Sequence, residues 1–423
     1  MLIFFIPQAL MCAELASAYP TDGGLNDWVK IAFGTKYGFL VSWMHWTALI
    51  FWYASFLTFL AINFSYMIGR PELADNKAFV LIMSLVVIWG LSFVSMRGMQ
   101  LGKYFTSVGA LGSLIPTVFL IGMAILAIVV LKVAPSASEY TVATMTPKMN
   151  MNSLVAISGI TFAYTGAEFT ANFVSDMKNP QKDYPRAIMI AAGLICVLYV
   201  VGAVCMTMLL PTSEIFAYTG TLDALAKASE LLGVPQILVQ VLAFGIALSV
   251  LGALVLYIVQ PVKMLFGYSE PGIFSEKFMK KNQYDIPEKA ILFQAVLITV
   301  LLAGVNLFSA VETIYNVLVT MTALTSLFPY VLLFAAYIKI KREKEDKPEL
   351  YQMTRNKKWG CFLGYSELVI CGVAIVCSAL PVMGTTSENI IYEIELIGGA
   401  LFVVLSGLWL WKRSGLKNKK VGS

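Results

Sequence analysis

The sequence predicts an all-α polytopic membrane protein. Its 423 residues are 58% hydrophobic and only 13% charged, whereas a soluble domain is roughly half apolar and a quarter charged. The apolar residues form runs whose lengths are close to the about 20 residues that a helix needs to cross a bilayer. The basic residues lie in short loops between these runs. We therefore expect the lipid bilayer as a partner and no nucleic acid.

Eleven apolar runs are expected to form membrane-spanning helices. In chain order they are Leu2–Ala18, Gly38–Ile68, Phe79–Met96, Ser107–Val133, Ser153–Val174, Ala187–Leu210, Pro235–Phe266, Ala290–Leu307, Val311–Ile338, Cys361–Pro381 and Ile390–Trp411. Three of them, Gly38–Ile68, Pro235–Phe266 and Val311–Ile338, are longer than a perpendicular span requires. Their length predicts tilted helices or flanking interfacial turns.

The loops at the two ends of these runs differ in their basic residues. One set of alternate loops, together with the C-terminal tail, holds 25 of the 30 Lys and Arg residues. Because cytoplasmic loops carry the excess of Lys and Arg, we expect a multi-pass protein of the plasma (inner) membrane with a cytoplasmic C-terminus. An odd number of spans then starts outside. Since Met1 leads directly into apolar residues without the charges of a signal peptide, we expect one span to be missing upstream.

The run Ser153–Val174 is interrupted by the stretch Phe162-Ala163-Tyr164-Thr165-Gly166-Ala167-Glu168. Gly166 lets the backbone leave helical geometry, and non-helical backbone at this depth survives only against protein or a water-filled cavity. Discontinuous helices of this kind hold the substrate in many secondary transporters. A glycine that packs closely within an unbroken helix is the alternative, and the pattern alone leaves both interpretations open.

Two acidic residues within apolar runs are candidate gating or proton-binding residues. An intramembrane carboxylate is costly unless it has a partner, water or a proton. Glu168 adjoins the interruption, where we expect a gating or proton-carrying role, with a purely structural hydrogen bond as the alternative. For Glu14 we expect a partner in the bundle interior and a conformational role rather than substrate contact. The only histidine, His45, lies in the aromatic context of a membrane interface.

Four stretches of the chain carry a resemblance to one family. They are Pro7–Leu15 with Ala18–Gly24 and Trp28, Ala32–Gly34 with Gly38-Phe39 and Trp43, Phe162–Glu168 with Lys178–Ile188, and Gln260–Lys263 with Pro271-Gly272 and Ile286–Ala290. Together they resemble the amino acid–polyamine–organocation (APC) superfamily permeases, and within these the glutamate/γ-aminobutyrate antiporter-like branch. The resemblance extends from Pro7 to about the last span.

The resemblance implies a LeuT-like five-plus-five inverted-repeat fold with 11 of the usual 12 helices, the family's first helix being absent. Within a single transporter domain over residues 1–423, residues 1–134 would form the first repeat without its first helix and 152–340 the second. Residues 361–412 would form two accessory helices. The absent helix normally supplies backbone amides to the substrate carboxylate, so we expect that half of the site to precede Met1.

The resemblance also implies a secondary active amino acid transporter, either an antiporter or a proton-coupled symporter. The substrate-binding candidates are Phe162, Ala163, Tyr164, Thr165, Gly166, Tyr53 and Leu254. Unwinding is expected to free backbone N–H and C=O groups of Ala163, Tyr164 and Thr165, and Phe162 is the expected gate. Tyr53 and Leu254 are included because they lie at a similar depth in their spans, and for Tyr53 an aromatic that only packs between helices is the alternative.

The expected substrate is an amino acid, with glutamate and γ-aminobutyrate as candidates, and protons are a candidate co-substrate. A monomer and a homodimer are both open. We see no cluster of metal ligands and no catalytic constellation, so we expect no cofactor, no metal and no enzymatic activity. The competing hypothesis is a truncated or degenerate permease that acts as a non-transporting membrane sensor or partner subunit.

Overall fold

The structure is a computed structural model. It describes residues 3–19, 21, 23–97, 100–130, 132, 140–142, 146, 150–166, 168, 177–267, 270–308, 311–343, 351–380 and 386–418. Within these residues every regular element is a helix, and no strand occurs. The composition of the chain explains this result, because only helices and closed barrels satisfy all backbone hydrogen bonds inside a bilayer.

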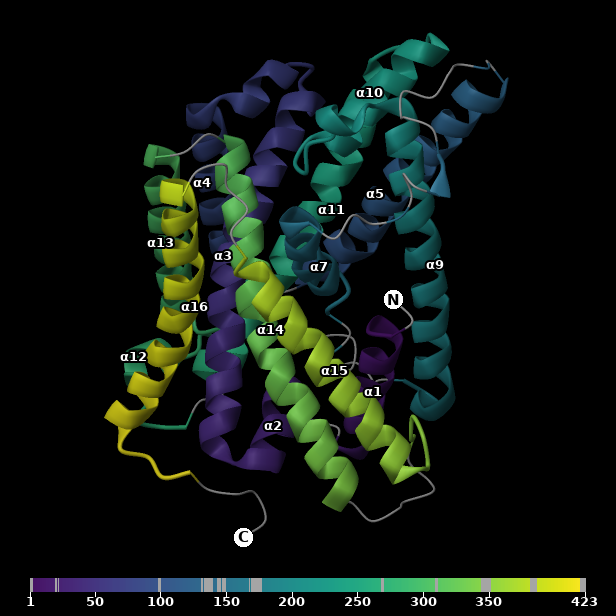
Figure 1. The fold of residues 1–423 in the computed structure, drawn as a ribbon. Coiled ribbons are helices and arrows are strands. Elements are labelled where there is room, and N and C mark those ends of the chain that lie inside the picture. The colour runs from purple at the N-terminus through teal and green to yellow at the C-terminus, as the bar shows by residue number, and fades with distance from the viewer. Residues whose placement is uncertain are drawn as a thin grey trace.

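The α-helices follow the chain in the order drawn in Figure 1. They are α1 (Phe5–Ala18), α2 (Leu25–Phe33), α3 (Thr35–Met67), α4 (Lys77–Ser95), α5 (Gln100–Ile125), α7 (Met151–Ala163), α9 (Pro180–Leu209), α10 (Gly220–Leu232), α11 (Ile237–Val262), α12 (Glu276–Met279), α13 (Glu288–Phe308), α14 (Val311–Glu343), α15 (Lys357–Ser378) and α16 (Thr386–Ser414). Short 3₁₀ turns form η1 (Pro71–Asp75) and η4 (Thr212–Glu214), and π-helical turns extend α5 and α11 as η2 (Leu126–Val130) and η5 (Lys263–Gly267).

Each of the eleven predicted apolar runs overlaps one of these helices, and α7 covers only the first part of the run Ser153–Val174. Among the described residues, eight helices are long and apolar enough to cross a membrane, namely α3, α4, α9, α11, α13, α14, α15 and α16. The helix α1, the Leu114–Val129 part of α5 with η2, and α7 are apolar but shorter. The predicted all-α polytopic membrane protein is therefore confirmed.

The loops lie at two opposite ends of the bundle. Figure 1 shows α2 and the C-terminus at the lower end and α10 at the upper end. The lower end carries the loops that are rich in Lys and Arg, and the upper end carries the poor ones. This arrangement agrees with the alternation expected from the sequence, and which end faces the cytoplasm stays a prediction.

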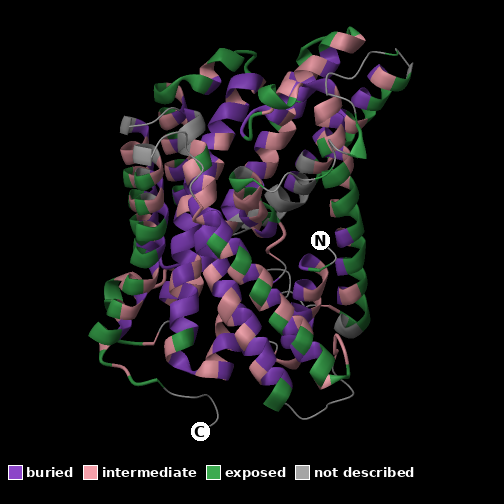
Figure 2. Ribbon diagram, viewed as in Figure 1, coloured by how far each residue is buried: buried purple, intermediate pink, exposed green. Residues whose placement is uncertain are grey.

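The helix α3 forms the centre of the bundle. It packs against α2, α4, α11, α14 and α16, and Figure 2 shows it buried along most of its length. Its 33 residues are apolar on all sides, which is typical of a helix surrounded by protein. In contrast, α9 exposes apolar side chains such as Ile190, Val197 and Val200, as expected of a surface that faces lipid.

The helices α5 and α11 approach each other closely at two glycines. A Cβ atom added at Gly112 would lie 2.2 Å from the backbone oxygen of Gly245. Small residues permit such close packing in membranes, where van der Waals contact replaces the hydrophobic effect between helices. The pair therefore fixes the position of α11, which contributes to the cavity described next.

Candidate functional site

The helix α7 (Met151–Ala163) covers the first part of the apolar run Ser153–Val174, and a break in this span stays a prediction. Its N-terminus is capped by the Asn150 side chain, which accepts the Ser153 N–H at 2.8 Å, and its last helical residue is Ala163. Gly166 has φ of 110°, a conformation that side-chain-bearing residues rarely adopt. Beyond Gly166 the described residues include only Glu168 before Met177, so the rest of Ser153–Val174 lies outside them.

The backbone N–H groups of the three residues that directly follow α7 are used within the protein. Tyr164 and Thr165 donate their N–H groups to carbonyl oxygens of the last turn of α7, at 3.1 and 2.9 Å. Gly166 donates its N–H to the Tyr330 hydroxyl of α14 at 2.8 Å. The sequence led us to expect free N–H groups at Tyr164 and Thr165, and the structure corrects this point, because the turn closes on itself.

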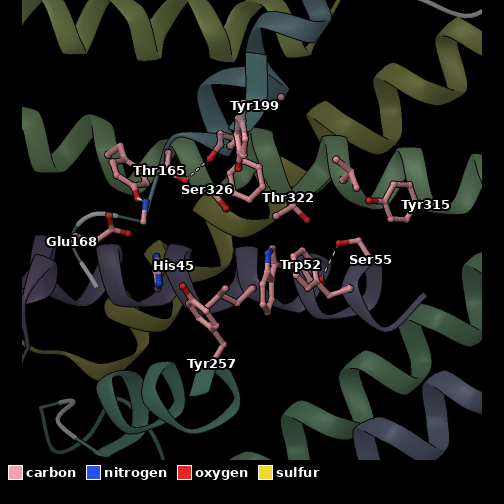
Figure 3. A pocket seen from close by; sticks show the side chains of 18 residues that line it. His45, Trp52, Ser55, Thr165, Glu168, Tyr199, Tyr257, Tyr315, Thr322 and Ser326 are labelled. Carbon is pink, nitrogen blue, oxygen red and sulfur yellow. Dashed lines mark hydrogen bonds between the residues drawn. The ribbon is translucent and has the colours of Figure 1, made fainter. Parts of the chain in front are cut away.

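A cavity of about 420 Å³ borders this turn. Five of the predicted site residues line it, namely Phe162, Ala163, Thr165, Gly166 and Glu168. Figure 3 shows that the other lining side chains come mainly from α3 and α14, with Tyr199 from α9 and Tyr257 from α11. The end of α7 therefore meets four long helices at one cavity.

Most of the lining residues on α3 and α14 were not among the sequence candidates. On α3 they are His45, Leu49, Trp52, Ser55 and Phe56, and on α14 they are Tyr315, Val319, Thr322, Ser326 and Tyr330. Steps of three and four residues place each set on one face of its helix. The detectable signal was a stripe of polar and aromatic residues at helical spacing within an apolar run. Thr322 also bonds back to the Leu318 carbonyl at 2.7 Å, as expected of a threonine in a helix.

Three sequence candidates lie outside the cavity lining. Tyr53 is fully buried, and its hydroxyl donates to the backbone carbonyl of Tyr257. Leu254 is fully buried in the main apolar core. Tyr164 packs against Tyr199, with ring centroids 5.8 Å apart. Tyr53 thus has the packing position that we gave as its alternative.

Glu168 lies at one end of the cavity. The side chain is 3% exposed, and among the described residues neither carboxylate oxygen has a hydrogen bond of normal geometry. The Tyr330 hydroxyl, which accepts the Gly166 N–H, is an electrostatic neighbour of this carboxylate. Figure 3 shows His45 near Glu168, at the same end of the cavity. An acid, an imidazole and a phenol therefore converge there.

Glu14 lies away from the cavity, in a buried ion pair. Its Oε1 is 2.5 Å from Nζ of Lys341, and both side chains are about 5% exposed. The Tyr337 hydroxyl and the Met353 N–H donate to Oε2 at 3.0 and 3.1 Å. Lys341 also donates to the Thr354 carbonyl at 2.7 Å. The expected partner in the bundle interior is thus present, and the network ties α1 to α14 and to the segment after it.

The described residues hold no group of three or more His, Cys, Asp or Glu side chains that could bind a metal ion. The chemistry that the cavity offers is therefore polar and aromatic contact around one carboxyl group. A cavity of a few hundred Å³ lined by aromatic, apolar and polar side chains is typical of a small-molecule site.

Comparison with known proteins gives concordant matches over most of the chain. The model of a family described as amino acid permease matches residues 1–402. An uncharacterized transporter of Legionella pneumophila is 30% identical over 97% of this chain and 88% of its own length. A glutamate/γ-aminobutyrate antiporter of Lactococcus lactis is 23% identical, over 95% of this chain and 80% of its own. A probable agmatine/putrescine antiporter of the same species is also 23% identical, over 97% and 86%.

Proposed function

Because the chain belongs to the amino acid permease family and is a multi-pass secondary transporter rather than an enzyme, we propose that it exchanges small amino compounds across the plasma membrane. The family assignment confirms the resemblance drawn from the sequence. Antiport is the mode we favour over proton symport, since two of the similar proteins are named as antiporters. One of these names contains an acidic amino acid and the other contains amines, so the charge of the substrate is a separate question.

We assign substrate binding to the cavity at the end of α7. The observation that carries this assignment is a helix that ends inside an apolar run, against a cavity of about 420 Å³. Substrate would contact Phe162, Ala163, Thr165 and Gly166, and Glu168 would act as the gating or proton-binding acid. Tyr53, Leu254 and Tyr164 would support the site from outside its lining.

The transport cycle would move one group of helices against the other around this cavity. In our proposal, residues 1–134 and 152–340 form the two repeats of a five-plus-five fold, with 361–412 as accessory helices. The C-terminus would face the cytoplasm, in agreement with the basic residues of the lower loops. Glu14 would act as a conformational latch through Lys341, because the ion pair joins α1 to α14.

Counterflow in proteoliposomes tests this assignment. Gly166→Leu should abolish flux while the protein still inserts, because a leucine resists the φ of 110°. Among the described residues, none beyond its chain neighbours lies within 4 Å of a Cβ added at Gly166. The matched control is Gly193→Leu in α9, which also has open space around its Cβ but normal helical backbone. Wild-type flux in the Gly166→Leu variant would contradict the assignment of substrate binding to the cavity at the end of α7. A folded wild-type protein without counterflow of any amino compound would favour a non-transporting sensor or partner subunit.

A further inference from the structure

A second pocket lies away from the proposed substrate cavity, between the ends of α14 and α15. It has a volume of about 430 Å³ and is lined by Arg342, Lys357, Lys358, Cys361, Phe362 and Tyr365. Arg342 belongs to the last turn of α14, and the other five residues belong to the first turns of α15. Figure 1 shows these ends of the two helices at the lower end of the bundle. This α14–α15 pocket therefore lies at one end of the membrane-spanning part of the protein.

The charged side chains of the α14–α15 pocket are basic. Arg342, Lys357 and Lys358 line it, and among the described residues no Asp or Glu does. The Arg342 guanidinium donates to the Tyr365 hydroxyl at 2.8 Å, and it lies 5.5 Å from the centre of the Tyr365 ring. Neither Arg342 nor Lys358 forms an ion pair with a described residue. Because a guanidinium has five N–H donors, Arg342 is held in place by Tyr365 and still has donors for an anion.

The pocket adjoins an exposed apolar stripe of α15, with which it shares two residues. The stripe consists of Trp359, Phe362, Tyr365, Val369, Val373 and Val376. Steps of three and four residues place these side chains on one face of the helix, while Gly364 and Cys371 on the other face are buried. From Phe362 to Val373 the helix rises about 16 Å, which is about half of the about 30 Å of a bilayer core. This part of the stripe therefore spans the depth that acyl chains occupy in one leaflet.

Aromatic side chains lie where the stripe meets the pocket. The rings of Trp359 and Phe362 stack with their centroids 5.1 Å apart and an interplanar angle of 19°, and Trp359 is 54% exposed. Trp and Tyr are enriched at the level of lipid headgroups, and Lys and Arg near helix ends extend their charges to the same level. The basic side chains of the pocket therefore lie at the depth of lipid phosphates.

The charge of the pocket, the apolar stripe and the aromatic side chains between them point to one ligand. We propose that the α14–α15 pocket binds the headgroup phosphate of an anionic phospholipid, with Arg342 and Lys358 as the main contacts. One acyl chain of this lipid lies along the stripe from Phe362 to Val373. Basic pockets between membrane helices bind the headgroups of anionic lipids in other proteins. The proposal does not depend on which substrate the protein transports.

Two other occupants of the pocket have the same charge as the lipid phosphate. One is an acid of residues 344–350, which lie outside the described residues and whose sequence holds Glu345, Asp346 and Glu349 together with Lys344 and Lys347. The other is free inorganic phosphate. An acid of the chain in the pocket predicts no preference for an anionic lipid over a zwitterionic one, and free phosphate predicts a preference that added phosphate removes.

The test is the quenching of tryptophan fluorescence by lipids with brominated acyl chains, with the whole chain in nanodiscs. Brominated phosphatidylglycerol and brominated phosphatidylcholine are compared at equal mole fractions. We expect phosphatidylglycerol to bind beside Trp359 at least about fivefold more tightly, the factor that one Lys or Arg contributes near an anionic lipid surface. Trp359→Phe should remove the difference between the two lipids, whereas Trp409→Phe at an exposed tryptophan of α16 should keep it. Equal quenching of the wild-type protein by both lipids would overturn the proposal.

A pair of double variants separates the pocket from the general charge of this end of the protein. Arg342→Gln/Lys358→Gln removes two exposed charges of the pocket, so both lipids should then quench equally. The matched control is Lys412→Gln/Arg413→Gln at the end of α16, where the Arg413 guanidinium lies 5.4 Å from the centre of the Trp409 ring. This control should keep the preference of the wild type. A preference that survives in the pocket variant, or that both double variants lose equally, would overturn the proposal.

Exchange of chloride for inorganic phosphate at equal ionic strength distinguishes the lipid from free phosphate. The preference of the wild-type protein for phosphatidylglycerol should persist in phosphate, because the acyl chain on the stripe adds to the binding of the headgroup. Loss of the preference in phosphate would assign the pocket to the free ion and overturn the proposal. The comparisons on the wild-type protein need no substitution, so they decide the proposal even if the pocket variant does not fold.

Discussion

Removal of the Glu14 carboxylate should destabilise the protein more than removal of its ionic partner Lys341. The two side chains are buried and 2.5 Å apart, and loss of one member of a buried ion pair costs about 3–5 kcal/mol because it leaves the other charge uncompensated. In Glu14→Leu, Lys341 retains the Thr354 carbonyl as its acceptor among the described residues. In Lys341→Met, Glu14 retains the Tyr337 hydroxyl and the Met353 N–H as donors.

These contacts set the expected magnitudes. We expect Glu14→Leu near 5 kcal/mol and Lys341→Met near 3 kcal/mol, the upper and lower ends of the range of about 3–5 kcal/mol for a broken buried pair. The double variant Glu14→Leu/Lys341→Met should lose clearly less than either single variant, since it buries no isolated charge. The free energy of unfolding can be measured by SDS titration in mixed micelles, followed by the fluorescence of the eight tryptophans.

The double-mutant cycle measures the interaction energy between Glu14 and Lys341. Losses that simply add in the double variant would mean that the two side chains do not interact. The control is Glu230→Gln in the exposed pair with Lys227, where the loss should stay below about 1 kcal/mol. If Glu14→Leu costs no more than this surface control, the network does not stabilise the protein.

Two further predictions concern packing and burial elsewhere in the bundle. Glu367 of α15 is fully buried, and among the described residues its carboxylate oxygens have no hydrogen-bond partner. Glu367→Leu should therefore raise the free energy of unfolding by about 1 kcal/mol or more. A lower free energy of unfolding in the same SDS titration would contradict this prediction. Gly112→Ala should lower the free energy of unfolding by about 1–3 kcal/mol through overpacking, since the new Cβ would meet the Gly245 carbonyl. Gly122→Ala on the same helix has open space around the new Cβ and should be neutral. Equal effects of the two substitutions would show that the close approach of α5 and α11 does not require a glycine at position 112.

The sequence predicted what depends on local pattern. The apolar runs required helices, and Gly166 beside polar residues marked one run as a candidate for a break without excluding an unbroken helix. Partners distant in the chain could not be derived in the same way. Glu14 was expected to pair, but nothing local identified Lys341, 327 positions away. The Tyr330 hydroxyl that holds the Gly166 N–H is 164 positions away, and only the packing of α14 brings it there.

Depth along a span did not identify which residues of α3 and α11 line the cavity. Tyr53 was chosen for its depth, yet it faces α11, while its neighbour Trp52 faces the cavity. Successive residues of a helix point about 100° apart, so adjacent positions serve different neighbours. His45 was read from its flanking tryptophans as interfacial, but it shares its helix face with Leu49 and Trp52 and lines the cavity.

The single helix α14 carries both the cavity face and the buried ion pair, and this has a mechanical consequence. From Tyr330 to Lys341 the helix rises about 16 Å. A tilt of about 10° at the level of the cavity would therefore move Lys341 by about 3 Å. This displacement is several times the width of the range of hydrogen-bond distances, about 0.5 Å. Glu14 can stay paired with Lys341 through such a tilt only if α1 and α14 move together as one rigid body. Opening of the cavity by α14 alone would instead break the pair.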